Sequence, residues 1–348
     1  MRAPARVLPA LTTRRALAAS VLLAASLGGG PSAGQNRTDP VTASLTLFAG
    51  TPAGLWRSRD WGGSWQRVLG QTTGAQLDAL GAARGILPLG PLVYVGGEEG
   101  IYTSKDFGEV WERTGSSPPV LCLLPSRYPQ SDPTLFVGTA AGLLKSGDGG
   151  RTFAPTSLWG TSVFRLDWPG PALVTATGRG VLISSDGGAH FEGPGQGLPA
   201  GDVRALALSS FFAVDPVLFA GVGQAGVFRS SDGGRTWVSA GLAGQRVGDL
   251  IWLGPFLYAA ADGGFFRSEN TGTTWTRLGT AGTGSPTQLL FPLAPAAGLE
   301  VFLATDQGLF HSLDGGGEWR PAGFRGENVL AVATFPPPSP LRRGKTRK

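Results

Sequence analysis

The sequence predicts an all-β fold, a seven-bladed β-propeller of four-stranded antiparallel blades. Three observations lead to it: a short motif recurs along the chain, a unit of strand-like segments recurs around that motif, and no amphipathic helical pattern stands out beyond the N-terminal segment. The 56 glycines and 27 prolines fit many tight turns, and an apolar content of 41% argues against disorder.

The recurring motif has the pattern Ser-x-Asp-x-Gly-x-x-aromatic, as in "SSDGGRTW". Its seven copies are spaced 46, 42, 38, 46, 38 and 44 residues apart, and they begin at Ser58, Ser104, Ser146, Ser184, Ser230, Ser268 and Ser312. A repeat of about 40 residues matches the length of one propeller blade.

The unit around each motif supplies the strands of a blade. A segment such as "PVLFAGV" precedes a glycine turn, a short strand ending at the motif serine follows, and further apolar strands such as "DVRALALS" separate the units. The first unit begins at its second strand, "LTLFAGT". We therefore expect Glu327–Phe335, "ENVLAVATF", to complete that blade and close the ring, which protects the edge strands.

The motif chemistry suits a hairpin turn better than a reactive carboxylate. Aspartate accepts hydrogen bonds from the amides of its own turn, glycine adopts positive φ, and the aromatic side chain packs toward the neighbouring blade. Asn270 can keep such hydrogen bonds but could not act as an acid. The carboxylate or amide positions are Asp60, Asp106, Asp148, Asp186, Asp232, Asn270 and Asp314, and the aromatic positions are Trp65, Trp111, Phe153, Phe191, Trp237, Trp275 and Trp319.

This pattern resembles the Asp box, or BNR repeat, first associated with sialidases. Across residues 41–335 the chain is similar to the seven-bladed BNR-repeat group that includes photosystem II stability/assembly factors. The resemblance implies an exported, non-catalytic propeller that binds a membrane-protein partner, with the boxes on the rim. No residue singles out a photosystem partner.

The two ends of the chain predict an exported protein, periplasmic or extracellular. Residues 1–34 resemble a signal peptide, with four arginines before the short apolar run Ala16–Leu27. The Arg14–Arg15 pair partly matches a twin-arginine signal, a general secretory signal fits equally, and an uncleaved anchor is the third alternative. Residues 35–40 form a linker, and residues 336–348 form a Pro-rich basic tail, predicted to be disordered, that could contact an anionic membrane surface.

Charge and residue content narrow the function. Nine of the 29 basic residues lie in these two ends and all 24 acidic residues lie between them, which leaves the body at −4. Such a body does not predict nucleic-acid binding. One cysteine, Cys122, and two histidines, His190 and His311, provide no metal-ligand cluster, so we expect no cofactor and no metal.

Two functions remain open. The first is a monomeric, non-catalytic scaffold for a protein or an envelope glycan, and the alternative is a sialidase-like or xyloglucanase-like glycoside hydrolase. The sialidase Arg-Ile-Pro motif is absent from the sequence, and no Tyr–Glu pair is evident. The short, even repeats leave little room for an elaborated active site.

The best candidates for binding are polar residues on or near the predicted inner strands, which line the central channel. Five come from the inner strands, and three more arginines lie on nearby loops. The inner-strand candidates are Asp78, Arg165, Arg204, Asp249 and Gln288, and the loop candidates are Arg84, Arg179 and Arg246. Contact with water alone is the simpler interpretation of these groups.

Overall fold

The computed structural model describes residues 46–69, 83–89, 91–98, 100–126, 131–170, 172–279, 284–292 and 300–334. All of them belong to one compact unit, Thr42–Lys348. The predicted signal peptide, linker and tail lie outside the described residues, and so does Asp78.

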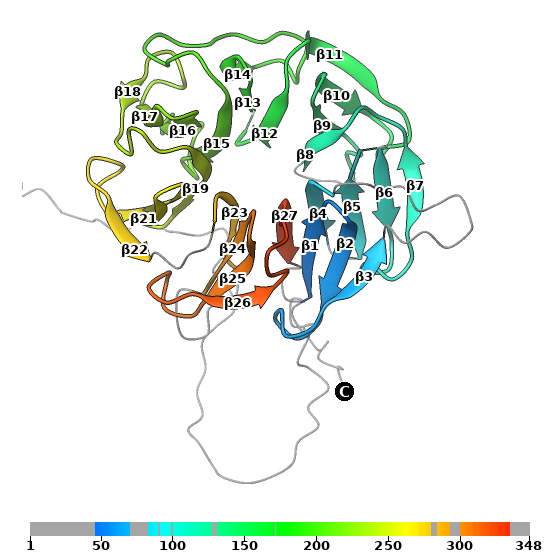
Figure 1. Ribbon diagram of the computed structural model, residues 1–348. Coiled ribbons are helices and arrows are strands. Elements are labelled where there is room, and N and C mark those ends of the chain that lie inside the picture. The colour runs from blue at the N-terminus through cyan, green and yellow to red at the C-terminus, as the bar shows by residue number, and fades with distance from the viewer. Residues whose placement is uncertain are drawn as a thin grey trace, which may run out of the picture. The chain divides into compact units, whose positions relative to one another are not determined.

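The described residues form seven antiparallel sheets arranged as the blades of a ring, which confirms the predicted seven-bladed propeller (Figure 1). The inner strands are β27 (Ala331–Thr334), β4 (Gly85–Leu89), β8 (Val120–Pro125), β12 (Val163–Asp167), β15 (Val203–Leu208), β19 (Val247–Leu253) and β23 (Pro286–Leu290). The second strands are β1 (Leu47–Thr51), β5 (Leu92–Gly96), β9 (Leu135–Thr139), β13 (Leu173–Thr177), β16 (Leu218–Val222), β20 (Phe256–Ala261) and β24 (Val301–Thr305).

The outer half of each blade holds the strands that flank the box. The third strands are β2 (Gly54–Ser58), β6 (Ile101–Ser104), β10 (Gly142–Ser146), β14 (Gly180–Ser184), β17 (Gly226–Ser230), β21 (Gly264–Ser268) and β25 (Gly308–Ser312). The fourth strands are β3 (Gln66–Leu69), β7 (Glu112–Gly115), β11 (Ala154–Trp159), β18 (Val238–Ser239), β22 (Thr276–Gly279) and β26 (Arg320–Gly323).

The ring closes as the sequence predicts. β27 pairs antiparallel with β1, with Leu47 opposite Thr334 and Gly50 opposite Ala331. The last described strand thus completes the first blade, and Figure 1 shows red β27 beside blue β1. This pairing leaves β1 with a partner on both sides, β27 and β2.

One blade departs from the four-strand pattern. The sheet of β12, β13 and β14 has three strands, and the fourth position is reduced to a single bridge between Ile183 and Glu192. Gly193 follows at φ 119° and Pro194 comes next, and proline has no N–H to continue a strand ladder. The chain then bridges to the next blade, where Gln196 pairs in parallel with Thr236.

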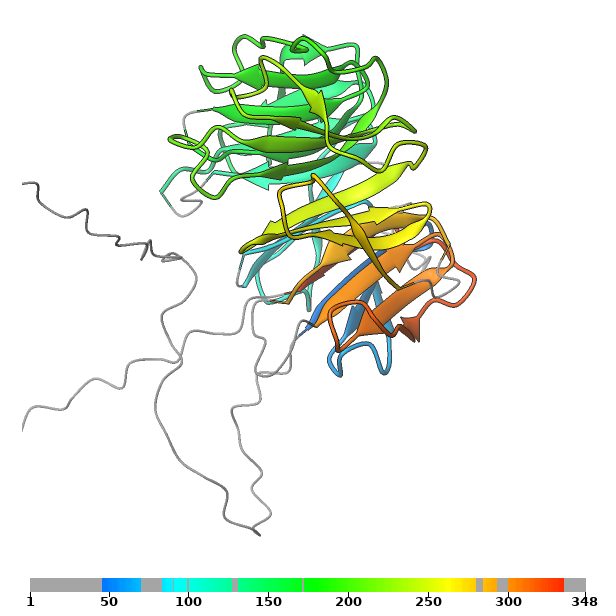
Figure 2. The ribbon, with the colours of Figure 1, turned by 90° about the vertical axis from the view of Figure 1, so that its left-hand side faces the viewer.

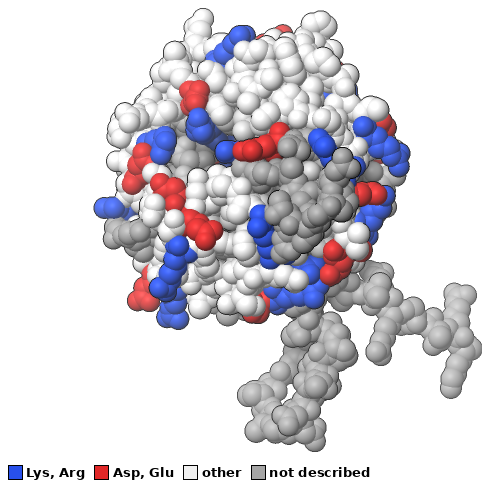
Figure 3. All heavy atoms as spheres, turned by 45° about the vertical axis from the view of Figure 1, so that its right-hand side comes forward, with Lys and Arg blue, Asp and Glu red and all other residues white. Residues whose placement is uncertain are grey.

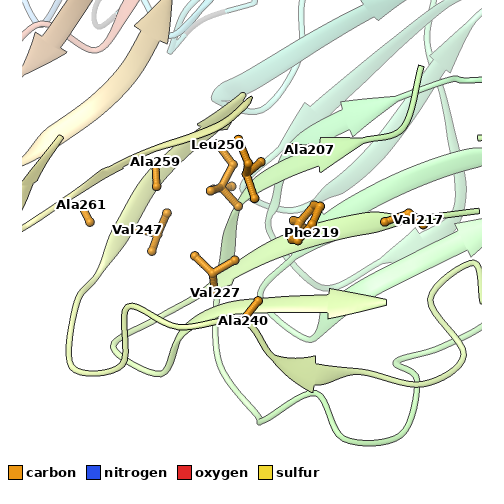
Figure 4. Close-up of a cluster of buried hydrophobic side chains, with 11 residues drawn as sticks. Ala207, Val217, Phe219, Val227, Ala240, Val247, Leu250, Ala259 and Ala261 are labelled. Atoms are coloured by element: carbon orange, nitrogen blue, oxygen red, sulfur yellow. The ribbon is translucent and has the colours of Figure 1, made fainter. Parts of the chain in front are cut away.

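The core lies between blades, because each sheet is covered on both faces by its neighbours. Every residue of β1, β9, β13, β16 and β24 is buried. Figure 4 shows one such layer, in which Phe219 and Val227 of one blade meet Val247 and Leu250 of the next. A Cβ on Gly221 would lie 2.8 Å from the Val247 Cβ, so only glycine permits this approach.

The strand directions give the propeller two distinct ends. Inner strands begin at the end where the second–third hairpins lie, since Val203 is opposite Val222 and Val222 is opposite Gly226. We call this the mouth end. The third strands run to the other end, the box end, where Ser230 lies level with Leu218. Figure 2 shows the stacked blades from the side. No helix in the described residues is long and apolar enough to span a membrane.

Candidate functional site

The Asp boxes form the turns between third strands and the residues that follow, at the box end. In the box that begins at Ser230, the serine Oγ donates to Asp232 Oδ1 at 2.8 Å and accepts from Gly234 N at 2.8 Å. Asp232 Oδ1 also accepts from Thr236 N at 2.9 Å. The carboxylate therefore accepts its hydrogen bonds from within its own turn.

The box with asparagine keeps the same turn, but the direction of one side-chain hydrogen bond is reversed. Asn270 Oδ1 accepts from Thr274 N at 2.8 Å, as the aspartates do, while Asn270 Nδ2 donates to Thr274 Oγ1 at 2.8 Å. In the aspartate box the threonine hydroxyl donates instead, from Thr236 Oγ1 to Asp232 Oδ2 at 2.6 Å. A hydroxyl can donate or accept, which explains why both side chains fit this position.

Hydrogen bonding keeps the box carboxylates ionised. The Ser64 hydroxyl and amide lower the pKa of Asp60 to about 2, and the Thr236 hydroxyl and amide lower the pKa of Asp232 to about 2. The pKa values of Asp106, Asp148, Asp186 and Asp314 are lowered as well, again by side-chain and backbone hydrogen bonds. Carboxylates of this kind are poor proton donors near neutral pH.

The box aromatic residues connect neighbouring blades. Trp65 Nε1 donates to the carbonyl of Ala322 at 2.7 Å, across the closure of the ring, and Trp275 Nε1 donates to Ala240 O at 2.7 Å. Trp319 meets Phe265 edge-to-face at 5.5 Å. The indole N–H groups of Trp111 and Trp237 instead donate within their own boxes.

A hollow of about 300 Å³ opens at the mouth end, away from the boxes. Its lining comes from the starts of the inner strands and the turns beside them. Four arginines dominate its charge, and apolar and small polar residues complete it. The lining is Arg84, Leu121, Phe164, Arg165, Arg204, Arg246, Gly248, Ser285, Pro286, Thr287, Asp306, Asn328 and Leu330. We call this site the basic mouth.

A β-bulge near the start of five inner strands brings one residue of each strand to the mouth. In β15, Val203 lies opposite Val222 and Ala205 opposite Gly221, so Arg204 is left out of the ladder. The same shift occurs in β8, β12, β19 and β23. The bulged residues are Leu121, Phe164, Arg204, Gly248 and Thr287, and Arg84 and Leu330 precede β4 and β27 at corresponding points.

An ion pair between a partly exposed arginine and a buried aspartate lies at the mouth. Arg165 Nη2 of β12 lies 3.1 Å from Asp249 Oδ1 of β19, reaching past β15, where the corresponding residue is Ala205. Asp249 also accepts from Leu250 N at 3.0 Å and from Leu289 N of the next blade at 2.8 Å. Burial raises the pKa of Asp249, and Arg165 and these amides oppose that shift.

Two of the other three arginines of the mouth, Arg204 and Arg246, have partners at their sides. Arg204 lies 4.5 Å over the ring of Phe164, and its Nη2 donates to Asp202 at 2.9 Å. Arg246 lies 3.5 Å from Asp262. Among the described residues Arg84 has no ion-pair partner. Each guanidinium keeps donors that its partner does not use.

Three of the described sequence candidates lie outside the mouth lining: Asp249 beneath it, Gln288 and Arg179. Gln288 Oε1 accepts from Val332 N of the next blade at 2.9 Å, so its side chain joins two inner strands. Arg179 lies in the β13–β14 hairpin and donates to Gly160 O at 3.2 Å at the surface. The mouth therefore gathers Arg84, Arg165, Arg204 and Arg246, with Asp249 beneath them.

Sequence reasoning missed several mouth residues because they are apolar or small. Phe164, Leu121 and Leu330 add apolar surface to the mouth, and Thr287 belongs to the same set of positions. The Asn328 Oδ1 atom is buried in this region with no hydrogen-bond partner in the described structure. Alignment of the residue before each inner-strand pairing position would have found Leu121, Phe164, Thr287 and Leu330.

The described part of the chain contains neither a cluster of metal ligands nor an activated thiol. It contains no group of three or more histidine, cysteine, aspartate and glutamate side chains that could hold a metal ion. Burial raises the pKa of the Cys122 thiol to about 12, so it stays protonated and unreactive.

The fold and the boxes together define a seven-bladed β-propeller with a box motif in each blade. Residues 101–114 match the sequence model of the BNR-Asp box repeat. The sequence matches none of the curated protein sequences.

Solved structures with the same fold include enzymes and binding proteins. An ancestral GH74 enzyme aligns at 16% identity and a TM-score of 0.60 over 82% of this chain and 45% of its own. The extracellular domain of a one-component system from B. thetaiotaomicron aligns at 16% and 0.62, over 78% of this chain and 37% of its own. YCF48 bound to D1 peptide aligns at 15% and 0.57, over 76% of this chain and 91% of its own. The chain thus spans less than half of the first two proteins, and these similarities establish the fold.

Proposed function

We propose that this protein is an exported, non-catalytic propeller that binds an acidic segment of a partner protein at the basic mouth. The observation that carries the proposal is the convergence of four arginines from four blades on one hollow, Arg84, Arg165, Arg204 and Arg246. Guanidinium groups bind carboxylates through paired, charge-assisted hydrogen bonds.

The shape of the mouth favours a peptide over a free ion. Phe164, Leu121 and Leu330 offer apolar contact beside the arginines, so a segment with both carboxylates and an apolar side chain would use the whole lining. YCF48, which shares the fold, is solved with a D1 peptide, and this supports a peptide partner here.

Export is part of the same proposal. The N-terminal segment has the arginines and the short apolar run of a signal peptide. The similarity to an extracellular sensor domain is consistent with this location.

The test is the affinity of the purified full chain for a fluorescent oligo-glutamate peptide, followed by anisotropy. Replacing Arg84 and Arg204 by glutamine should weaken binding at least about tenfold, because each supplies charge-assisted hydrogen bonds. The exposed box residue Arg235, replaced by glutamine, is the matched control and should leave affinity unchanged. Equal affinities for the three proteins would refute the proposal.

The second candidate, a glycoside hydrolase, is favoured by the shared fold of the GH74 enzyme. Glycosidases need two carboxyl groups about 5–10 Å apart. Among the described lining residues of the mouth, Asp306 is the one carboxylate, and its Oδ1 accepts from Ser285 N at 2.9 Å. Release of reducing sugar from xyloglucan or from sialosides by the purified chain, abolished by Asp306→Asn, would favour the enzyme.

A further inference from the structure

Three of the four arginines that line the basic mouth already have a carboxylate beside them. The pairs are Arg165–Asp249 at 3.1 Å, Arg204–Asp202 at 2.9 Å and Arg246–Asp262 at 3.5 Å. Arg84 is exposed and has no such partner among the described residues. The positive charge of the mouth is therefore matched except at Arg84.

Asp306 is a carboxylate of the same lining that no described cation matches. It lies in the hairpin between β24 and β25 and forms no ion pair with the described residues. Its position is fixed, because Asp306 N donates to Ser285 O at 3.0 Å and Ser285 N donates to Asp306 Oδ1 at 2.9 Å. A Cβ on Gly284 would lie 2.1 Å from Asp306 Oδ1, so this approach requires glycine. The carboxylate is held through Oδ1, and Oδ2 accepts no hydrogen bond from the described residues.

Arg84 and Asp306 lie on either side of one blade. Arg84 directly precedes β4, Asp306 belongs to the blade of β23–β26, and the blade between them is the one that β27 completes. Leu330 directly precedes β27. All three residues line one hollow of about 300 Å³, so one short segment can contact them together.

A ligand of a single sign leaves one of these two charges without a counter-charge. Glutamates alone would pair with Arg84, but they would also bring negative charge toward Asp306, and like charges repel. An ammonium group beside Asp306 would replace that repulsion with attraction. The face that Figure 3 shows likewise mixes basic and acidic side chains, which is not the single-sign surface that attracts polyanions.

We propose that the segment bound at the mouth carries both signs, with a carboxylate for Arg84, an apolar side chain for Leu330 and a lysine or arginine for Asp306. This inference rests on the proposed function, because it concerns the same segment in the same hollow. The arginines that already have carboxylate partners then supply hydrogen-bond donors to the segment more than net charge. Asp306 is thus a specificity residue, which selects acidic segments that also contain a cation.

The experiment measures the anisotropy of fluorescent hexapeptides with the full chain. The parent peptide is hexaglutamate, and each glutamate in turn is replaced by lysine or, as the uncharged match, by glutamine. At one position or more, the lysine peptide should bind about fivefold more tightly than its glutamine counterpart. Asp306→Asn should remove this preference, because the amide has no charge but can still accept from Ser285 N. Glu327→Gln is the matched control, since Glu327 is exposed at the mouth end but outside the lining, and the preference should remain.

A lysine preference that Asp306→Asn removes and Glu327→Gln keeps supports the proposal. Lysine peptides that bind no more tightly than glutamine peptides at every position overturn it, and so does a preference that survives Asp306→Asn or that Glu327→Gln also removes. Such results leave the proposed function standing if hexaglutamate binds and needs Arg84, whereas absence of binding by every peptide refutes both. The lysine–glutamine comparison on the unaltered chain requires no variant, so it decides the question even if Asp306→Asn fails to fold.

Discussion

At the scale of single residues, the boxes are turns held together by their own side chains. Asp232 accepts hydrogen bonds from the amides of Arg235 and Thr236 and from two hydroxyl groups. Asn270 accepts from the Thr274 amide in the same way, but it donates to the Thr274 hydroxyl instead of accepting from it. That asparagine can replace aspartate in the box indicates a structural role, because an asparagine could not replace a catalytic acid or base.

Asp232→Ala should lower the free energy of unfolding by about 1 kcal/mol, since the amides it served are exposed and water can partly replace it. Asp232→Asn should cost less, because Asn270 already supports the same turn. Urea unfolding of both variants checks this. Equal losses in the two variants would show that hydrogen bonding is not what the box requires.

Acid should destabilise the protein through the boxes. The folded pKa of Asp60 and Asp232 is about 2, below the ordinary 3.8, so their stabilisation is complete above pH 3.8 and is lost as the pH falls toward 2. Asp249 has a raised pKa and acts in the opposite sense over its own titration. The melting temperature should therefore drop in this window, and by less in Asp232→Asn. A flat profile would contradict the account.

The ion pair under the mouth should be structurally important. Arg165→Gln leaves the buried Asp249 carboxylate without its cation, which should cost about 2–3 kcal/mol given that Arg165 is partly exposed. Adding Asp249→Asn to Arg165→Gln should restore part of that loss. Urea unfolding of the single and double variants measures both effects, and additive losses would argue against a coupled pair.

At the scale of elements, the mouth depends on where each inner strand begins to pair. Separate bulges in three blades bring Arg204, Phe164 and Leu121 to the mouth. The residue after the bulge is buried in two of these blades, as Ala205 and Cys122, but in the third blade it is Arg165, which also lines the mouth. At Gly248 the neighbouring inner strand is so close that a Cβ would lie 2.1 Å from the carbonyl oxygen of Pro286. In this blade the close packing therefore allows only glycine at the bulge. In other blades the bulged residue has a side chain that can contact a ligand in the mouth.

Gly248→Ala should destabilise the protein by about 2 kcal/mol, because backbone on the next blade must move. Gly147→Ala is the matched control, since a Cβ there meets nothing within 4 Å. Thermal unfolding compares the two. Equal melting temperatures would mean that the inner strands are not packed at this distance.

At the scale of the whole molecule, the sequence repeats contain most of the fold. Seven boxes at even spacing implied seven blades, and a first unit lacking its inner strand implied closure by the last segment. The site was less predictable. Arg204 and Arg246 could be identified as polar residues near the channel, but Phe164 belongs to the mouth only through its bulge, which repeat spacing does not encode.

The three-stranded blade shows the same limit. Its box aromatic, Phe191, is followed within three residues by Pro194, and the repeat pattern alone predicted a normal fourth strand there. Proline alone was not a sufficient signal, because Pro155 and Pro321 lie within the fourth strands β11 and β26 of other blades.

Hydrogen exchange of the full chain, with and without saturating oligo-glutamate peptide, tests the central claim most directly, because it locates the bound segment. The account predicts slowed exchange at the starts of the inner strands, around Arg84, Phe164 and Arg204, with the boxes unchanged. Protection centred on the boxes, or spread evenly over the ring, would contradict the assignment of function to the basic mouth.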